Sequence, residues 1–301
     1  MSAVVRYPVH FASSRGFRQA FHHERSHGGR TAMVCVHGWP ETKRLYHRVL
    51  GPLRDAGFDV VVPDLRAFGD SDIGSDGFND VVSHARDVHA LVAGHLGYES
   101  VILIGGDLGG SVIQEIAMRW PEWVERMVLF NSPLPFMREE MAGLATRADA
   151  STRDYFERQG TDADGLIAEL STADACRNYI AQFYGPRHWA HPGNFSPAEV
   201  SYHVEPFGDP RRLRETFGNY ESVYSAEKRS ERPMFGANRE TPTLIVFGTS
   251  DHVIYPDFDK MAQVVFAQHS GPFRINNCGH FVPWEAPERF VELTLGFCRD
   301  S

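Results

Sequence analysis

The chain has few cysteines, no long apolar run and an excess of negative charge. Its four cysteines lie far apart, without Cys-x-x-Cys spacing, at Cys35, Cys176, Cys278 and Cys298. This distribution disfavours a zinc site and a disulfide framework and predicts buried or incidental thiols. No run of about 18 apolar residues occurs, and the first residues lack a cationic segment followed by an apolar core. We therefore expect an intracellular, cytoplasmic protein without a membrane span.

The charge balance excludes further classes of partner. Among 301 residues, 39 Asp and Glu face 30 Lys and Arg, which gives a formal net charge of −9. Such a chain is unlike proteins that bind nucleic acid or anionic membranes. The length suits one large α/β domain or two small ones with a sizeable buried core.

Five short apolar runs, each bounded by Gly, Pro, Asp or Asn, predict buried strands. Helical patterns lie between them, the clearest with apolar residues three or four apart from Val81 to Leu96, after a candidate N-cap at Asn79. Strands that alternate with helices predict an α/β fold with a mostly parallel central sheet flanked by helices. The predicted strands are residues 31–36, 58–62, 101–104, 127–130 and 244–247.

The alternation stops between Ser132 and about Asn238. This segment is polar, holds most of the tyrosines and contains Gly-Pro, Pro-Gly and Asp-Pro pairs, a pattern typical of a helical insertion. The strand pattern resumes at Thr243. We predict a core domain formed by residues 1–131 and 239–301, with residues 132–238 inserted as a helical cap.

A glycine-rich run from Gly105 to Gly109 holds Asp107 between a predicted strand and a predicted helix. It matches a small-x-nucleophile-x-small turn, in which the outer glycines let strand and helix approach while the middle residue takes a strained conformation. Serine is usual at that position, and a carboxylate there attacks carbon instead of transferring an acyl group. A plain glycine-rich turn, including one that cradles phosphate, is the alternative.

Two later residues follow in the order nucleophile, acid, base that such a turn requires. Asp251 comes just after the apolar run 244–247, at the strand end where α/β sites assemble, although a turn or helix cap also explains an aspartate there. His280 follows a short strand-like run, in a Gly-His pair before a final helical segment. It is one of 15 histidines, but this position predicts a catalytic base that the acid orients.

The tetrapeptide His37-Gly38-Trp39-Pro40 follows the run 31–36. A loop in this place contributes one backbone N–H to an oxyanion hole, and the residue after the nucleophile contributes the other. The predicted donors are therefore Trp39 and Leu108. Proline has no N–H, and a cis bond before it would fix the turn with the Trp39 amide inward. We expect His37 to form structural hydrogen bonds, and a tight turn without catalytic meaning is the alternative.

Together these motifs resemble the α/β-hydrolase fold family and, within it, the epoxide hydrolases. The HGWP turn, the aspartate turn, and the segments at residues 62–71, 248–251 and 278–281 all occur in the family's order and spacing. The resemblance implies a helical cap that supplies two tyrosines to the epoxide oxygen. Tyr155 resembles the first of these and Tyr220 the second. Packing could account for any single tyrosine, and the competing ones are Tyr179, Tyr184, Tyr202 and Tyr224.

The resemblance implies an epoxide hydrolase that converts an epoxide and water to a vicinal diol. Asp107 would attack a ring carbon while Tyr155 and Tyr220 hold the ring oxygen, which leaves an alkyl ester on Asp107. Water activated by His280 and Asp251 would then hydrolyse the ester. No metal or organic cofactor is implied, the expected partner is a small-molecule epoxide, and a homodimer stays open.

Other functions remain as alternatives. A haloalkane or haloacid dehalogenase uses the same triad, but the tryptophan or arginines with which these enzymes hold halide are replaced by Leu108, Gly109 and Gly110. A non-catalytic binding protein of the same fold is disfavoured by the intact triad, and a serine esterase by the absence of Gly-x-Ser-x-Gly. Gly106 and Leu108 depart from the His and aromatic residue of most relatives. Asn131 offers no carboxylate after the run 127–130, which supports Asp251 as the acid.

Overall fold

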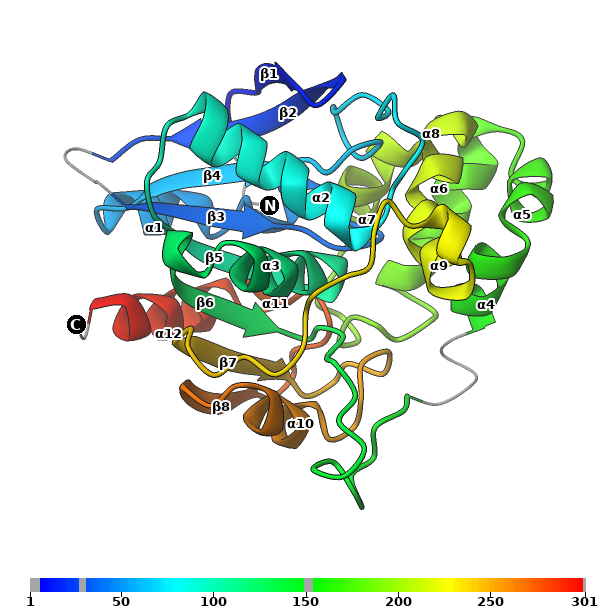
Figure 1. Cartoon of the computed structure of the whole chain (residues 1–301). Helices are drawn as coiled ribbons and strands as arrows, with labels where there is room; N and C mark the ends of the chain where they lie inside the picture. Colours follow the sequence, from blue (N-terminus) through cyan, green and yellow to red (C-terminus); the bar gives the residue numbers. More distant parts are fainter. Residues whose placement is uncertain (1–5, 27–30, 149–153, 300–301) are drawn as a thin grey trace.

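The fold is built on one sheet of eight strands, as far as the described residues show (Figure 1). The computed structural model describes residues 6–26, 31–148 and 154–299. Strand order across the sheet is β1-β2-β4-β3-β5-β6-β7-β8. The strands are β1 His10–Ser14, β2 Phe17–Glu24, β3 Ala32–Val36, β4 Asp59–Pro63, β5 Val101–Gly106, β6 Val124–Phe130, β7 Thr243–Gly248 and β8 His269–Ile275.

The sheet is parallel from β4 to β8 and antiparallel at β1 and β2. Strands β3, β5 and β7 are buried along their whole length, as their continuous apolar sequences predict. The predicted mostly parallel sheet is thus confirmed. Strands β1 and β2 were not among the predicted strands, because their polar residues interrupt the apolar pattern.

Helices of the core cover both faces of the sheet. Figure 1 shows α2 and α3, which pack against each other, in front of the sheet, and α1 behind it next to α12. The core helices are α1 Leu50–Asp55, α2 Val81–His89, α3 Asp107–Arg119, α10 Phe258–Val265, α11 Val282–Glu285 and α12 Pro287–Arg299. Short helical turns add η1 Lys43–Tyr46, η2 Ala90–His95, η3 Pro121–Trp123, η5 Gln182–Tyr184, η6 Glu205–Phe207 and η7 Ala226–Lys228.

The N-cap predicted at Asn79 is wrong by one residue. Helix α2 is capped by Asp80, whose carboxylate accepts from the Ser83 N–H at 2.9 Å. The side chain of Asn79 instead donates to Glu215 of the segment that follows β6, also at 2.9 Å. Asn79 and Asp80 can both form an N-cap, and the contact of Asn79 with the distant Glu215 leaves Asp80 to cap the helix.

In the described part of the chain between β6 and β7, six α-helices gather beyond the carboxyl ends of the parallel strands (Figure 1). The predicted helical insertion in this part of the chain is therefore present, whereas its limits as a domain, residues 132–238, stay a prediction. We refer to these helices as the cap. They are α4 Asp154–Thr161, α5 Ala163–Glu169, α6 Ala173–Ala181, α7 Pro197–Val204, α8 Pro210–Thr216 and α9 Gly218–Tyr224.

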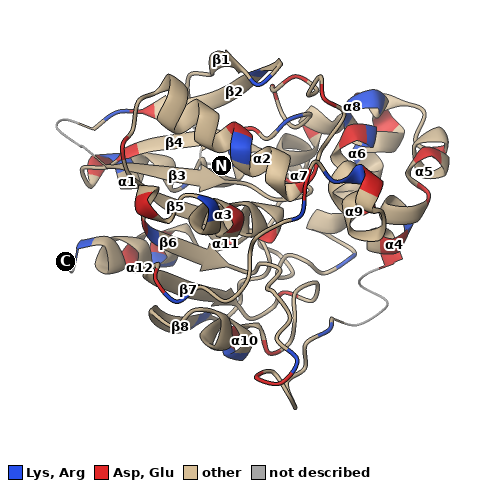
Figure 2. Ribbon diagram, in the orientation of Figure 1, with Lys and Arg blue, Asp and Glu red and all other residues tan. Residues whose placement is uncertain are grey.

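Charged side chains concentrate on the helices and loops. Figure 2 shows acidic and basic residues interspersed along them, while β3, β5 and β7 carry none. Mixed signs of this kind favour a solvated surface over a single-sign binding face. None of the described helices has the length and apolar character needed to cross a bilayer.

Candidate active site

Asp107 lies at the turn from β5 into α3 with a left-handed φ of 47°. The glycines beside it are required by close contacts. A Cβ on Gly105 would lie 2.7 Å from the carbonyl oxygen of Gly109, and one on Gly109 would lie 2.1 Å from that of Val36. The turn therefore presents the carboxylate at the end of the central strand in a strained conformation that its surroundings hold in place.

Asp107, Asp251 and His280 come together from the ends of β5, β7 and β8. His280 Nδ1 hydrogen-bonds Asp251 Oδ2 at 2.7 Å, and its Nε2 lies 3.4 Å from Asp107 Oδ2. The second distance permits charge attraction without the alignment of a good hydrogen bond. The imidazole thus has a fixed side toward Asp251 and a side directed at the nucleophile and at any water between them.

The protonation of His280 depends on two carboxylates. Burial by itself lowers the pKa of this imidazole, but Asp251 and Asp107 outweigh burial and raise the pKa well above its usual value. In the free site, therefore, the cationic form is favoured. Loss of the charge on either carboxylate would lower the pKa again.

Asp251 is held by three donors that sequence reasoning had not identified. Its Oδ1 accepts from the backbone N–H groups of Val253 and Ile254, at 2.7 and 3.1 Å. Its Oδ2 accepts from the amide of Asn131 at 2.7 Å. Asn131 lies at the end of β6, the position noted for its missing carboxylate, and its side-chain oxygen also accepts from Gly248 N at 2.9 Å. The Asn131 amide therefore holds the Asp251 carboxylate in position.

The HGWP turn brings a backbone donor to the Asp107 carboxylate. Trp39 N–H donates to Asp107 Oδ1 at 2.8 Å, and the Trp39–Pro40 bond is cis. A Cβ on Gly38 would lie 2.5 Å from the Asp107 Cβ, so only glycine lets the turn come this close. Leu108, the other predicted donor, follows Asp107 in the first turn of α3 and lines the cavity beside it.

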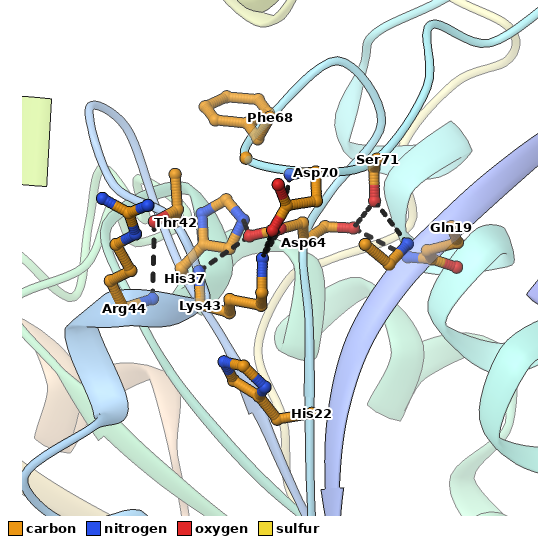
Figure 3. Close-up of polar contacts among 12 residues, drawn as sticks. Gln19, His22, His37, Thr42, Lys43, Arg44, Asp64, Phe68, Asp70 and Ser71 are labelled. Atoms are coloured by element: carbon orange, nitrogen blue, oxygen red, sulfur yellow. Dashed lines mark hydrogen bonds and ion pairs between the residues drawn. The ribbon is translucent and has the colours of Figure 1, made fainter. Parts of the chain in front are cut away.

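His37 is fully engaged in the scaffold beneath this turn (Figure 3). Its Nδ1 donates to Gly38 O at 2.8 Å, and its Nε2 accepts from Leu65 N at 3.0 Å. Burial lowers its pKa to about 4, so the ring is neutral. Nearby, Asp64 accepts from the Lys43 N–H at 2.8 Å and pairs with the ammonium group of Lys43. These contacts join two loops and leave His37 no free nitrogen for a catalytic base.

Glu41 is a buried carboxyl group that the sequence did not single out. Its Oε2 accepts from Gly38 N, which ties it to the oxyanion turn. Burial raises its pKa to about 8, while the cationic His280 opposes that rise. Only its place one residue after Pro40 could have drawn attention to it.

Tyr155 of α4 and Tyr220 of α9 face Asp107 from the cap. Both are buried, and their ring centroids lie 5.7 Å apart. The Trp39 ring stacks on Tyr155, with centroids 5.6 Å apart and planes at 3°, and meets Tyr220 edge-on. Burial raises both phenol pKa values well above the usual range, and the charge of Asp107 adds to the rise. Both phenols therefore stay protonated and able to donate.

The competing cap tyrosines have other positions. Tyr179 interacts with Gln159, Tyr184 donates to Pro40 O, Tyr202 bonds His47, and Tyr224 is 51% exposed. Tyr155 and Tyr220 are the cap tyrosines that line a cavity of about 250 Å³ above Asp107. Sequence reasoning missed other residues around this site. They are Trp189, whose ring centroid lies 5.0 Å from that of His280, and the cavity residues Ser111, Pro133, Phe156, Asn219, Val253, Ile254 and Tyr255.

Most of the chain matches a known family. Residues 31–287 match the family described as alpha/beta hydrolase fold. The chain belongs to the α/β-hydrolase fold family. This confirms the family that the motifs predicted.

This α/β hydrolase is similar to several proteins named as epoxide hydrolases. It is 29% identical over 297 residues to the "Soluble epoxide hydrolase" of Corynebacterium sp. (strain C12), with 96% of each chain covered. The solved structure "Epoxide hydrolase CorEH without ligand" has a TM-score of 0.81 and 26% identity, covering 97% of this chain and 98% of that one. "AB hydrolase superfamily protein YfhM" of Bacillus subtilis (strain 168) is 32% identical over 273 residues, 89% of this chain and 90% of the relative.

Proposed function

We propose that this α/β hydrolase is an epoxide hydrolase that opens its substrate through an ester on Asp107. The observation that carries the proposal is the placement of a carboxylate nucleophile opposite two protonated phenols across one cavity. Attack on a ring carbon moves negative charge to the epoxide oxygen, and phenols are suited to receive it there. The similarity to named epoxide hydrolases supports the same chemistry.

In the first half of the reaction an Asp107 oxygen bonds to a ring carbon and the carbon–oxygen bond of the epoxide breaks. Tyr155 and Tyr220 donate to the released oxygen, which becomes the first hydroxyl of the diol. The carboxylate needs no base for this step, because it is the nucleophile in its ionised form. The product is an alkyl ester of Asp107.

Esterification prepares the second half. It removes the Asp107 charge, one of the two that raise the pKa of His280, so the imidazole releases its proton more readily. Neutral His280, oriented by Asp251, then takes a proton from water, which attacks the ester carbonyl carbon. The Trp39 and Leu108 amides stabilise the oxyanion, and the ester bond breaks to release the second hydroxyl. Over the cycle a tyrosine passes its proton to the first hydroxyl and regains one from cationic His280; the consumed water then gives one proton back to His280 and the other to the second hydroxyl.

The dehalogenase alternative lacks support around the nucleophile. Leu108 is apolar, and no tryptophan or arginine is among the described residues that line the cavity. A leaving halide would find neither the tryptophan nor the arginines that hold halide in dehalogenases. The cytoplasmic location and a homodimer stay predictions from the sequence.

The test separates the two halves of the reaction. His280→Gln, mixed with styrene oxide, is expected to gain the mass of one substrate in intact mass spectrometry, because alkylation proceeds and hydrolysis does not. Asp107→Asn is expected to gain none. His10→Gln, a substitution of an exposed histidine on β1, serves as the control with normal turnover and no adduct.

The absence of an adduct on His280→Gln with every epoxide that the wild type hydrolyses would contradict the ester mechanism. A panel of haloalkanes run beside the epoxides decides between the leaving groups. Halide release without diol formation would favour the dehalogenase instead.

A further inference from the structure

Besides Tyr255, whose hydroxyl hydrogen-bonds the backbone of Leu134, two polar side chains in the cavity have no part in the proposed mechanism. Ser111 lies on α3 one helical turn after Asp107, and Asn219 lies on α9 immediately before Tyr220. Both line the cavity, whose remaining wall is largely apolar, with Leu108 beside the nucleophile and Val253 and Ile254 from the core. One polar group thus comes from the core and one from the cap.

Neither side chain has a hydrogen-bond partner among the described residues. A serine within a helix commonly bonds the carbonyl one turn earlier, which here is that of Asp107. That carbonyl instead accepts from Ser132 Oγ at 3.2 Å. Thr216, by contrast, is paired with the Trp39 indole at 3.1 Å. Trp189 Nε1 and His280 Nε2 also lack a partner beside the site in the described part of the chain. Neither Trp189 nor His280 lines the cavity, however, whereas Ser111 and Asn219 do.

A buried polar group without a partner is costly unless a ligand or water satisfies it, which applies to Ser111 more than to the half-buried Asn219. Ser111 is 4% exposed, so bulk water reaches it little. Ser111 shares a helix face with Asp107, so its hydroxyl lies beside the place where the epoxide ring must sit, and Asn219 lines the same cavity from the cap. A substituent on the ring therefore passes within their reach.

The charge of the cavity restricts the nature of that substituent. No Lys or Arg is among the described residues that line it, and Asp107 contributes a negative charge. A carboxylate on the substrate would meet repulsion without a compensating cation. A neutral oxygen can accept from the serine hydroxyl and the asparagine amide.

We propose that this cavity selects epoxides that carry a neutral ether or hydroxyl oxygen next to the ring, recognised by Ser111 and Asn219. This rests on the proposed function, since the ring position is set by Asp107 and the two tyrosines. Hydrocarbon epoxides of the same size are converted less efficiently, because they leave both side chains unpaired.

The test compares phenyl glycidyl ether with its analogue in which a methylene group replaces the ether oxygen. The wild-type kcat/KM is expected to favour the ether about tenfold, as two modest hydrogen bonds would produce. Ser111→Ala and Asn219→Leu are each expected to lower that preference about threefold or more, with turnover of the methylene analogue retained. That retained turnover also shows that the variants fold.

Ser201→Ala on α7 is the matched control. Its hydroxyl bonds Pro197 O at 2.9 Å on the outside of the cap, so the preference for the ether should not change. A wild-type ratio near one, or variants that slow both substrates equally, would overturn the inference while leaving the epoxide hydrolase intact. Failure of the wild type to hydrolyse either compound would instead overturn the proposed function.

Discussion

A chain of hydrogen bonds joins the sheet to the cap through two buried histidines. His22 of β2 donates from Nδ1 to the carbonyl oxygen of Pro8 at 2.7 Å, since a carbonyl can only accept. Its Nε2 lies 2.8 Å from Nε2 of His47, whose Nδ1 in turn meets the hydroxyl of Tyr202 on α7. Each bond in this chain has one direction. Tyr202 donates to His47, His47 donates to His22, and both rings are neutral.

A proton added to His22 would set its Nε2–H against that of His47 across the 2.8 Å contact, and one added to His47 would go to Nδ1 and take away the acceptor of the Tyr202 hydroxyl. Burial, and after it the nearby His22, Lys43 and Arg44, lower the pKa of His47 to about 3, while Asp64 opposes this shift. The pKa of His22 is also lowered, first by burial. The folded chain therefore excludes protons that the unfolded chain binds below its ordinary histidine pKa of about 6.5.

The sign and size of the effect follow from linkage. His47 contributes stability that is complete above the unfolded pKa and is lost as the pH falls toward the folded pKa. Between about pH 7 and pH 5 the unfolded chain becomes protonated at this site and the folded chain does not, which costs about 2 kcal/mol of the free energy of unfolding. Below the folded pKa the loss stops, because both states then bind the proton.

Urea unfolding at a series of pH values measures this contribution. In His47→Asn the side-chain amide can still accept from Tyr202, but the titrating group is gone. We expect the variant to lose about 2 kcal/mol less than the wild type between about pH 7 and pH 5. His95→Gln, at an exposed position, should keep the wild-type pH dependence. An unchanged pH dependence in His47→Asn would refute the reasoning.

Two further predictions concern residues that hold the site. In Asn131→Ala, Asp251 loses the side-chain amide that donates to it. Single-turnover kinetics should then show ester hydrolysis slowed about tenfold or more, with little effect on alkylation. Equal slowing of both steps would count against a positioning role for Asn131. Glu41→Gln replaces a carboxyl group, whose pKa in the folded chain is about 8, with an amide that does not ionise. Between about pH 5 and pH 7 the folded wild type keeps the carboxyl proton, whereas the unfolded chain has lost it. The free energy of unfolding of the wild type therefore falls as the pH rises. Over that range the variant should gain about 2 kcal/mol relative to the wild type in urea unfolding. A constant difference between the two proteins would contradict this.

Several parts of the fold follow from local sequence. Strands β3, β5 and β7 are continuous apolar runs that end at turn residues, and the glycines around Asp107 report contacts that a side chain would prevent. Strands β1 and β2 escaped prediction because they form the antiparallel edge of the sheet, where polar residues such as Gln19 and His22 interrupt the pattern.

The residues of the site also fall into two groups, those that the sequence predicts and those that only the folded structure reveals. Asp107, Asp251 and His280 each follow a strand in a fixed order, so their meeting could be predicted before any contact was known. Asn131 and Glu41 act only through partners that the fold brings to them, namely Asp251 for the first and Gly38 for the second. No spacing along the chain encodes such contacts. The choice of Tyr155 and Tyr220 depended on the resemblance to a family, and the cavity gives it a physical basis.

The charge of Asp107 affects the protonation of His280 and of both cap tyrosines. Before attack, the Asp107 carboxylate raises the pKa of His280 and adds to burial in raising those of Tyr155 and Tyr220. Alkylation moves that charge from Asp107 to the epoxide oxygen, which lies against the phenols. Alkylation thus places an acceptor beside the tyrosines and at the same time lowers the pKa of His280. An aspartate nucleophile therefore orders the two halves of the reaction, since the base for the second half becomes available only after the first has taken place.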